Sequence, residues 1–363
     1  MIYLVAFCLS GFLFQLVKHE KNELAKKFTC FVAIMIPVLL SAMRGIDVGR
    51  DTRTYAYPVF QVAKNTGHFS ELIGYDGIEP AFLFVEYIGA KYLNSFSFVL
   101  GTMQLITNYC FYKAIRKKCG EENIAVGMMI FYFFIYGGTL NAIRQSVAIG
   151  LVLLATVCFS EKKYITTMAL FAVAIAFHTT AGIALVILMI YAMADKDRIY
   201  RAINILIVVF SIVLNFSWRK IFSDIFSHVA IWGSNYADYL VYGKAGERNE
   251  ISIICGTIAL AIICLATKKN NGKWNRLLIS MSLIFVCYQP LTEKVYVASR
   301  LLLYPQAFMI TIYPDVKTLI QFKIGRNDAK WVWNALIVFF FFCIWFYTVI
   351  MHNANSILPY SFR

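Results

Sequence analysis

Charged residues are scarce in this sequence. Of its 363 residues only 15% are charged, while 60% are hydrophobic and 16% are aromatic. Soluble domains carry about 25% charged residues, so the composition excludes a soluble domain of this size. Long apolar runs such as 251–267 and 333–350 take the place of charge, and runs of about 17–25 apolar residues are long enough to cross a bilayer. We therefore expect an all-α polytopic integral membrane protein, with 1–363 forming a single transmembrane domain.

Several catalytic and metal-binding signatures are absent. The nine cysteines contain no C-x-x-C pair and most lie inside apolar runs, which argues against a metal site or a disulfide framework. The sequence has no Walker A motif, no H-E-x-x-H and no G-x-S-x-G, so nothing suggests ATP use, a bound metal or another cofactor. The net charge of +14 would suggest nucleic acid in a soluble chain. Here the basic residues fall in short segments between apolar runs, so we expect no nucleic-acid partner.

We predict about twelve transmembrane helices from the apolar runs. They are 2–17, 28–43, 96–112, 124–138, 141–159, 164–177, 180–194, 202–216, 251–267, 277–289, 298–313 and 332–350. The first run has neither a basic segment before it nor a small-residue cleavage site, so we interpret it as a helix and not as a signal peptide. Residues 80–93 are too short to cross and carry Glu86 and Lys91. A helix lying in the outer interface is expected there.

The placement of Lys and Arg gives the orientation. With the N-terminus outside, the short inner segments hold most of the 34 basic residues, as the positive-inside rule requires. We therefore predict a multi-pass protein of an inner (cytoplasmic) membrane, with both termini non-cytoplasmic. Two long loops, at about 44–95 and 217–250, then lie outside. The second is rich in Tyr and Trp, which is typical of interfacial aromatic belts and also of surfaces on which sugar rings stack.

Four polar positions of the predicted outer face do not resemble ordinary connectors. Arg and Asp alternate in residues 44–53, a pattern that fits either an anion-binding site or a self-neutralising structural cluster. Arg144 begins an otherwise apolar run, where it either binds an anion through its fork of donors or extends to the lipid headgroups. Arg300 has the same placement, with an ion pair to Glu293 as the structural alternative. His178 is either a structural hydrogen-bonding residue or an acid–base group.

The sequence around these positions resembles the EpsG-like family, which is grouped with Wzy-type exopolysaccharide and O-antigen polymerases. The resemblance rests on R-G-x-x-V-G-x-D-T-x-x-Y at 44–55, N-x-x-R-Q-x-x-A at 141–148, F-H-T-T-A at 177–181 and S-R-L-x-x-Y at 299–304. It implies a helical bundle like that of the C-type glycosyltransferases, without a metal. It also implies transfer of a glycan from undecaprenyl pyrophosphate to a sugar hydroxyl of another lipid-linked unit at the outer face.

The resemblance implies roles for individual residues and partners. The residues that would bind the pyrophosphate or orient the substrates are Arg44, Arg144, Arg300, Gln145 and Tyr55. Either Asp51 or His178 would be the base that takes the proton of the acceptor hydroxyl. The expected partners are the undecaprenyl-pyrophosphate-linked oligosaccharide and the bilayer, together with a chain-length regulator and a flippase. An O-antigen-ligase-like transferase, a transporter or flippase of lipid-linked sugars, and a structural subunit of a biosynthetic complex stay open as alternatives.

Overall fold

The computed structural model describes two compact units. The described residues are 1–228, 253–254, 256–261, 264, 272–293, 296–313, 323–324, 327–328 and 330–363. The first unit comprises Met1–Gly182 and Tyr313–Arg363, and the second comprises Ile183–Ile312. The described residues are largely helical, with one antiparallel pair of two-residue strands, β1 Lys323–Ile324 and β2 Asn327–Asp328. The all-α class that the composition predicts is confirmed for these residues.

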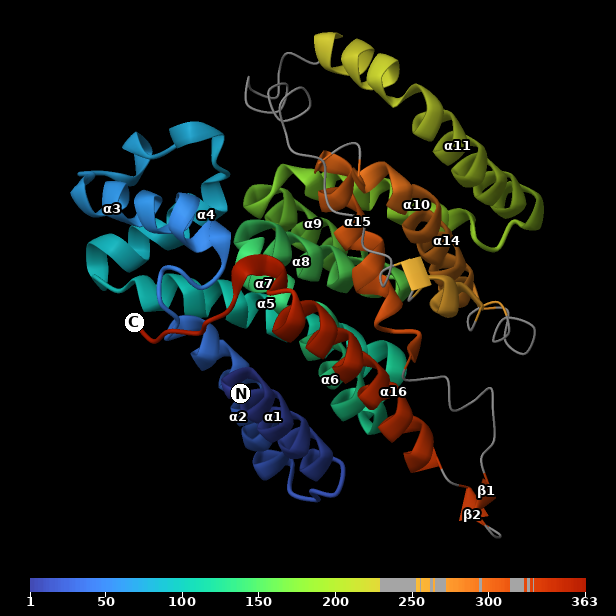
Figure 1. Ribbon diagram of the computed structural model, residues 1–363, viewed down its shortest axis with the longest axis horizontal. Helices are drawn as coiled ribbons and strands as arrows, with labels where there is room; N and C mark the ends of the chain where they lie inside the picture. The colour runs from blue at the N-terminus through green and yellow to red at the C-terminus, as the bar shows by residue number, and fades with distance from the viewer. Residues whose placement is uncertain are drawn as a thin grey trace. The chain divides into compact units, whose positions relative to one another are not determined.

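The first unit is built from the helices of the N-terminal half and from the last helix. Its elements are α1 Ile2–Val17, α2 Glu23–Ala42, η1 Thr52–Ala56, α3 Tyr57–Asn65, η2 Phe69–Glu71, η3 Tyr75–Gly77, α4 Pro80–Tyr87, η4 Ile88–Tyr92, α5 Phe96–Cys119, η5 Glu121–Asn123, α6 Ile124–Phe134, α7 Tyr136–Asn141, α8 Ile143–Ser160, α9 Tyr164–Phe177, α16 Lys330–Trp345, η10 Phe346–Met351 and η11 Ala354–Ser356. Helices α1 and α2 form a hairpin (Figure 1).

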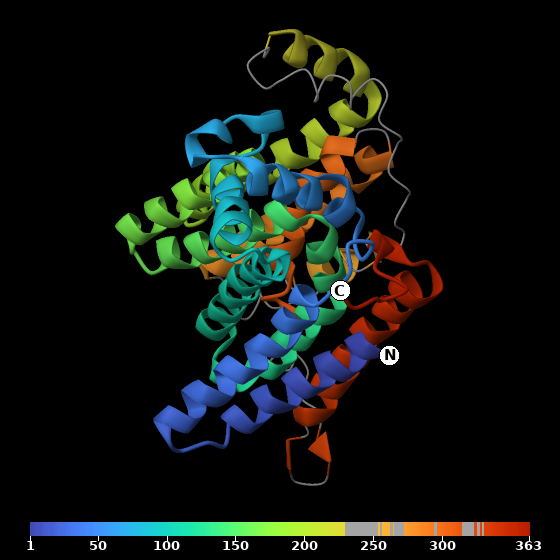
Figure 2. The same cartoon turned by 90° about the vertical axis from the view of Figure 1, so that its left-hand side faces the viewer.

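An aromatic cluster joins the two ends of the chain inside this unit. The ring of Phe7 stacks on that of Tyr132 with centroids 5.1 Å apart, and it lies 6.2 Å from the ring of Trp345. Because stacked and edge-to-face rings add to the stabilisation from burial, this cluster fixes α1 against α6 and α16. Figure 2 shows the first and last helices of the chain next to each other.

The second unit contains α10 Ala184–Met193, α11 Asp197–His228, α14 Lys273–Tyr288, η8 Gln289–Glu293 and α15 Tyr296–Met309. Polar contacts attach α14 to the elements before it. Arg276 Nη1 donates to Ala194 O at 2.8 Å and to Asp197 Oδ1 at 2.6 Å. Further along α14, Ser280 Oγ donates to Asn204 Oδ1 at 2.8 Å.

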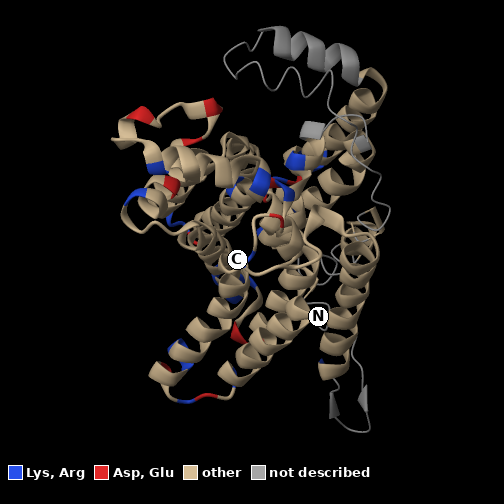
Figure 3. Cartoon of the chain, turned by 60° about the vertical axis from the view of Figure 1, so that its left-hand side comes forward, with Lys and Arg blue, Asp and Glu red and all other residues tan. Residues whose placement is uncertain are grey.

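Four of the described helices are long and apolar enough to cross a membrane. They are Glu23–Ala42, Ile143–Ser160, Asp197–Ser217 and Lys330–Met351. Shorter apolar helices occupy Ile2–Val17, Tyr164–Phe177 and Thr179–Met193. Charged residues are frequent in the turn between α1 and α2 and around α3 and α4, whereas most helix faces are uncharged (Figure 3). These features are those of a membrane protein, and the count of twelve crossings stays a prediction.

Helix boundaries largely follow the apolar runs. Helix α1 matches the predicted range, and the predicted break at His178 is confirmed, because α9 ends at Phe177 and His178 is extended with φ −161° and ψ 124°. The prediction of one continuous helix over 124–138 is wrong. The chain leaves helical geometry at Ile135, with φ −119° and ψ −36°, just before two glycines that weaken a helix.

The two predicted outer-face segments contain more helix than the sequence indicates. In 44–95, α4 lies within the interfacial helix predicted at 80–93, and α3 and four short helical turns are additional. Helix α3 buries Val59, Phe60 and Ala63, the spacing of one helical face. Within 217–250, α11 continues to His228 after a kink at Ser217 with φ −118°, and residues 229–250 lie outside the described residues. The same holds for the side chain of Glu293, and hence for its predicted ion pair with Arg300.

Candidate functional site

The segment that follows α2 is fastened to the junction between α7 and α8. Arg44 Nη2 donates to Leu140 O at 3.1 Å, and the backbone N–H of Asp51 donates to Asn141 Oδ1 at 3.2 Å. Gly49 has φ +83°, and a Cβ added there would lie 2.4 Å from Leu140 O. Only glycine combines this conformation with so close an approach. Two sequence motifs about 90 residues apart therefore form one structure.

Arg44 braces this junction from the inside. Its side chain is 1% exposed, and its guanidinium donates to Ser41 Oγ at 2.8 Å and to Thr52 Oγ1 at 3.1 Å. Burial lowers the pKa of the Arg44 guanidinium to about 10, so the group keeps its charge at neutral pH. Arg44 was predicted to bind pyrophosphate, but the hydrogen bonds described here go to protein atoms, which is the arrangement of a structural residue.

The last residues of the chain complete the same junction. Gly45 N–H donates to Ser361 O at 2.8 Å, Gly49 N–H donates to Ser356 O at 2.9 Å, and Arg363 N–H donates to Met43 O at 2.9 Å. The motifs recognised in the sequence end well before this tail. The contribution of the C-terminal tail to the junction was therefore not predicted.

A carboxylate that the sequence analysis overlooked lies at the centre of the site. Glu79 is 7% exposed and occupies the N-cap position of α4 without a capping hydrogen bond from its side chain. Its Oε2 pairs with Nη1 of Arg144, and its Oε1 accepts the backbone N–H of Thr179 at 3.0 Å. His178 Nδ1 lies 3.5 Å from the same Oε1. Two of the predicted site residues, Arg144 and His178, are thus brought together by a third that was not predicted.

Aromatic rings cover the other side of the Arg144 guanidinium. Its Cζ lies 4.7 Å from the centroid of the Tyr55 ring and 5.8 Å from that of Phe82. A guanidinium over an aromatic face is held by the ring quadrupole. Tyr55 and Arg144 are therefore in contact, and Asn141, which accepts the backbone N–H of Asp51, lies three residues before Arg144. Gln145 is buried directly after Arg144.

The hydrogen bonds of His178 indicate its tautomer. Its Nδ1 accepts the backbone N–H of Thr180 at 3.3 Å and lies 3.1 Å from Thr180 Oγ1. A backbone N–H can only donate, so Nδ1 acts as the acceptor and the neutral ring carries its proton on Nε2. In this state His178 is a donor towards a ligand and not a base.

Arg300 is placed differently from the other candidates. It lies on α15 in the second unit and is half-buried there. Arg44, Asp51, Tyr55, Arg144, Gln145 and His178 all belong to the first unit.

The sequence carried one sign of Glu79, an acidic residue followed by Pro80 at the start of an apolar run, a pattern typical of a helix N-terminus. That sign does not say which cation the carboxylate pairs with.

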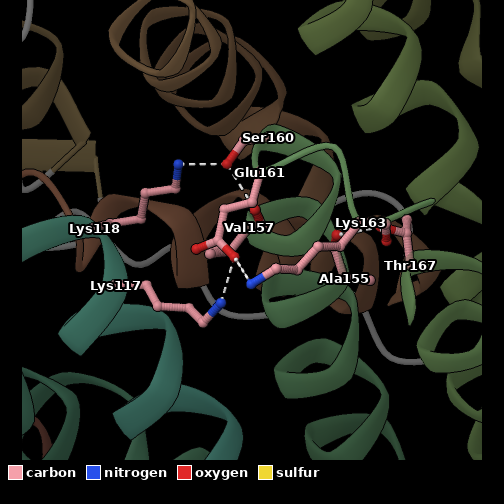
Figure 4. Close-up of polar contacts among 8 residues, drawn as sticks. All are labelled: Lys117, Lys118, Ala155, Val157, Ser160, Glu161, Lys163 and Thr167. Carbon is pink, nitrogen blue, oxygen red and sulfur yellow. Dashed lines mark hydrogen bonds and ion pairs between the residues drawn. The ribbon is translucent and has the colours of Figure 1, made fainter. Parts of the chain in front are cut away.

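A second charged cluster lies where the end of α5 meets the turn between α8 and α9 (Figure 4). Glu161 Oε2 pairs with Lys117 Nζ at 2.5 Å and with Lys163 Nζ at 2.8 Å. Lys118 Nζ donates to Ser160 Oγ at 2.5 Å, and burial lowers the pKa of Lys118 to about 8. The predicted topology assigns these residues to the cytoplasmic side.

The fold and the site together define a helical membrane protein with a half-buried group of hydrogen-bond donors suited to an anion. Residues 27–362 match the EpsG family, so the chain belongs to the EpsG family, and the resemblance noted in the sequence is confirmed. No curated protein and no solved structure matches the chain.

Proposed function

We propose that this chain is a metal-independent membrane glycosyltransferase that polymerises lipid-linked polysaccharide repeat units. Membership of the EpsG family indicates a role linked to exopolysaccharide synthesis. The observation that carries the finer proposal is the group around Glu79: the Arg144 guanidinium and the Thr179 N–H donate to its carboxylate, and the His178 ring lies beside it. Guanidinium and backbone N–H groups are the donors that proteins use for phosphate oxygens.

In the proposed reaction Arg144 binds the pyrophosphate of the undecaprenyl-linked donor glycan. The oxygen of an acceptor sugar hydroxyl attacks the anomeric carbon and forms the new glycosidic bond. The bond from that carbon to the pyrophosphate oxygen breaks, and its electron pair stays on the pyrophosphate. Arg144 stabilises this growing negative charge, with Gln145 and Tyr55 as orienting groups. Attack opposite the leaving group inverts the anomeric configuration.

The base in this proposal is Asp51. Two candidates came from the sequence, and the Thr180 bonds leave neutral His178 with its proton on Nε2. Asp51 is half-buried and its backbone is held by Asn141, so its carboxylate is positioned and able to take the hydroxyl proton. Asp51→Asn should then remove polymer at all pH values, whereas His178→Gln, which keeps a donor, should retain part of the activity.

The proposal includes the topology that the sequence predicts. About twelve helices cross the bacterial inner membrane with both termini outside, so that Arg144 and Asp51 face the periplasmic or outer side. The proposed reaction does not need ATP, because the lipid-linked donor brings its own activated phosphate. A cysteine introduced at Arg53, which is exposed, should react with a membrane-impermeant maleimide in intact spheroplasts. If that cysteine reacted only after lysis, the orientation would be the opposite of the one proposed.

The decisive experiment compares wild type with Arg144→Lys in a strain deleted for this gene. Lysine keeps the charge and loses the bidentate fork, so the variant tests geometry at a phosphate. At equal membrane levels, wild type should give a ladder of long chains and Arg144→Lys a single repeat unit. A deletion strain that keeps normal chain length but loses attachment or surface display would favour the ligase or the transporter.

A further inference from the structure

The donors around Glu79 have the composition of an anion-binding site that is already filled. One guanidinium and one backbone N–H donate to a single carboxylate, which belongs to the chain itself, and the Nδ1 of His178 lies beside it at 3.5 Å. Glu79 and Arg144 lie on segments 65 residues apart, so the pairing is a feature of the tertiary structure. The carboxylate occupies the face of Arg144 that an external anion would use, since Tyr55 covers another face.

Pyrophosphate bound to Arg144 competes with Glu79 for the donors of one guanidinium. Each terminal nitrogen carries two N–H groups, and Nη1 already pairs with Glu79 Oε2. An oxyanion that binds this edge of the guanidinium in a bidentate manner needs the same nitrogen. Such an anion therefore has to displace the carboxylate.

A membrane site also faces a competitor at high concentration. Phospholipid headgroups carry a phosphodiester with one negative charge, whereas the pyrophosphate of the carrier lipid carries more than one. A bare arginine at this depth would attract both. An internal carboxylate raises the affinity that an anion needs in order to bind Arg144, because the anion must bind the donors better than the carboxylate does. Specificity of this kind is obtained by penalising the wrong ligand.

We propose that Glu79 is an internal counter-ion of Arg144 that pyrophosphate displaces and that phosphodiester headgroups do not. This inference rests on the proposed role of Arg144 in binding the carrier pyrophosphate. Between turnovers Glu79 neutralises the guanidinium. On binding, pyrophosphate oxygens take over the Arg144 donors and accept the Nε2–H of His178, and the Thr179 N–H keeps Glu79 at the edge of the site.

The test measures binding of two soluble probes to the full chain in phosphatidylcholine nanodiscs. Inorganic pyrophosphate represents the carrier, and glycerophosphoglycerol represents the phosphodiester headgroup. Wild type should bind pyrophosphate at least about tenfold more tightly than the phosphodiester. Glu79→Gln should bind pyrophosphate about tenfold more tightly than wild type and should also bind the phosphodiester. Glu71→Gln removes an exposed charge from the same segment and should leave both dissociation constants unchanged.

Two results would overturn the counter-ion role. One is wild-type binding of the phosphodiester as tight as that of pyrophosphate, or no pyrophosphate binding at all. The other is a Glu79→Gln variant whose pyrophosphate binding is unchanged or weaker. If Glu79→Gln fails to fold, Glu79→Asp replaces it: the shorter acid weakens the contact with Arg144, and pyrophosphate binding should tighten by about threefold.

The gel assay keeps this inference separate from the proposed function. Polymer ladders that depend on Arg144, together with unaltered binding in Glu79→Gln, would defeat the counter-ion role alone. The predicted binding changes in a chain that extends no polymer would defeat the polymerase alone.

Discussion

Two carboxylates in the first unit each pair with basic groups, and their surroundings differ. Glu79 is 7% exposed and meets an Arg144 side chain that is 20% exposed. Glu161 is 30% exposed and meets two lysines that are 28% and 57% exposed. Ion pairs exposed to water contribute little, because solvent screens them, whereas a buried pair leaves a costly charge behind when one partner is removed. We therefore expect loss of the ion pair near α4 to cost much more stability than loss of the pairs near the end of α5.

The largest loss of stability is expected for Arg144→Met, which tests the comparison most directly. Removing the partner of Glu79 leaves a buried carboxylate without its cation, and the free energy of unfolding should fall by about 3–4 kcal/mol. Denaturation of the purified protein in mixed micelles measures this loss. The double variant Arg144→Met/Glu79→Met should recover most of it, since no charge remains buried. A double variant as unstable as the single one would show that the pairing is not what stabilises this region.

Gly49→Ala tests whether the frame around the buried pair is as tightly built as its distances indicate. The substitution forces a side chain to φ +83° and places Cβ 2.4 Å from Leu140 O, so a loss of about 3 kcal/mol and of polymer is expected. Gly74→Ala is the matched control, because Gly74 also has φ +83° but nothing lies within 4 Å of the added Cβ. Its cost should be only about 1 kcal/mol. Equal losses for the two variants, read from thermal unfolding, would contradict the close approach.

Glu86 sharpens the comparison by adding a buried carboxyl of another kind. It is 0% exposed, and neither carboxylate oxygen has a hydrogen-bond partner, so burial raises the pKa of Glu86 well above 4.5. The folded chain then keeps a proton that the unfolded chain loses, and stability falls as pH rises from 4.5 towards the raised pKa. Glu86→Gln mimics the neutral acid and should lose that part of the pH dependence. Melting temperatures from pH 5 to pH 8 measure it, with Glu71→Gln as an exposed control.

The smallest effect is expected at the second cluster. Glu161→Gln removes the shared partner of Lys117 and Lys163, yet both lysines reach solvent, so the free energy of unfolding should change by less than about 1 kcal/mol. The change should also shrink at high salt. A loss as large as that of Arg144→Met would show that exposure does not separate the two clusters.

The helices were predictable because length and apolar composition decide them locally. Both ends of α1 follow from its sequence, and the break at His178 follows from the polar residues between two apolar runs. Helix α4 lies within the interfacial helix predicted at 80–93, whereas α3 was not predicted, because it is short and buries only part of its surface. Residues 229–250 and the side chain of Glu293 lie outside the described residues and leave those predictions as they were.

The site was predictable only where its residues stand out in the sequence. Arg144 and His178 were visible as polar groups at the ends of apolar runs, and the structure brings them together. Glu79 was not, because its partners are 65 and 100 residues away and only the packing of α4 selects them. The number of bonds that Arg44 makes within the chain was hidden for the same reason, since an arginine that binds a ligand and one that braces a loop look alike in a sequence.

The contact between the tail and the segment after α2 also affects how the protein is made. Gly45 bonds to Ser361, so the segment after α2 is translated about 300 residues before the strand-like tail that holds it. At roughly 5–20 residues per second this delay lasts about 15–60 s. During that time the N-terminal helices can enter the membrane while the junction around Gly49 still lacks its last partner. Assembly of this junction thus awaits the synthesis of residues 356–363, long after the segment they hold.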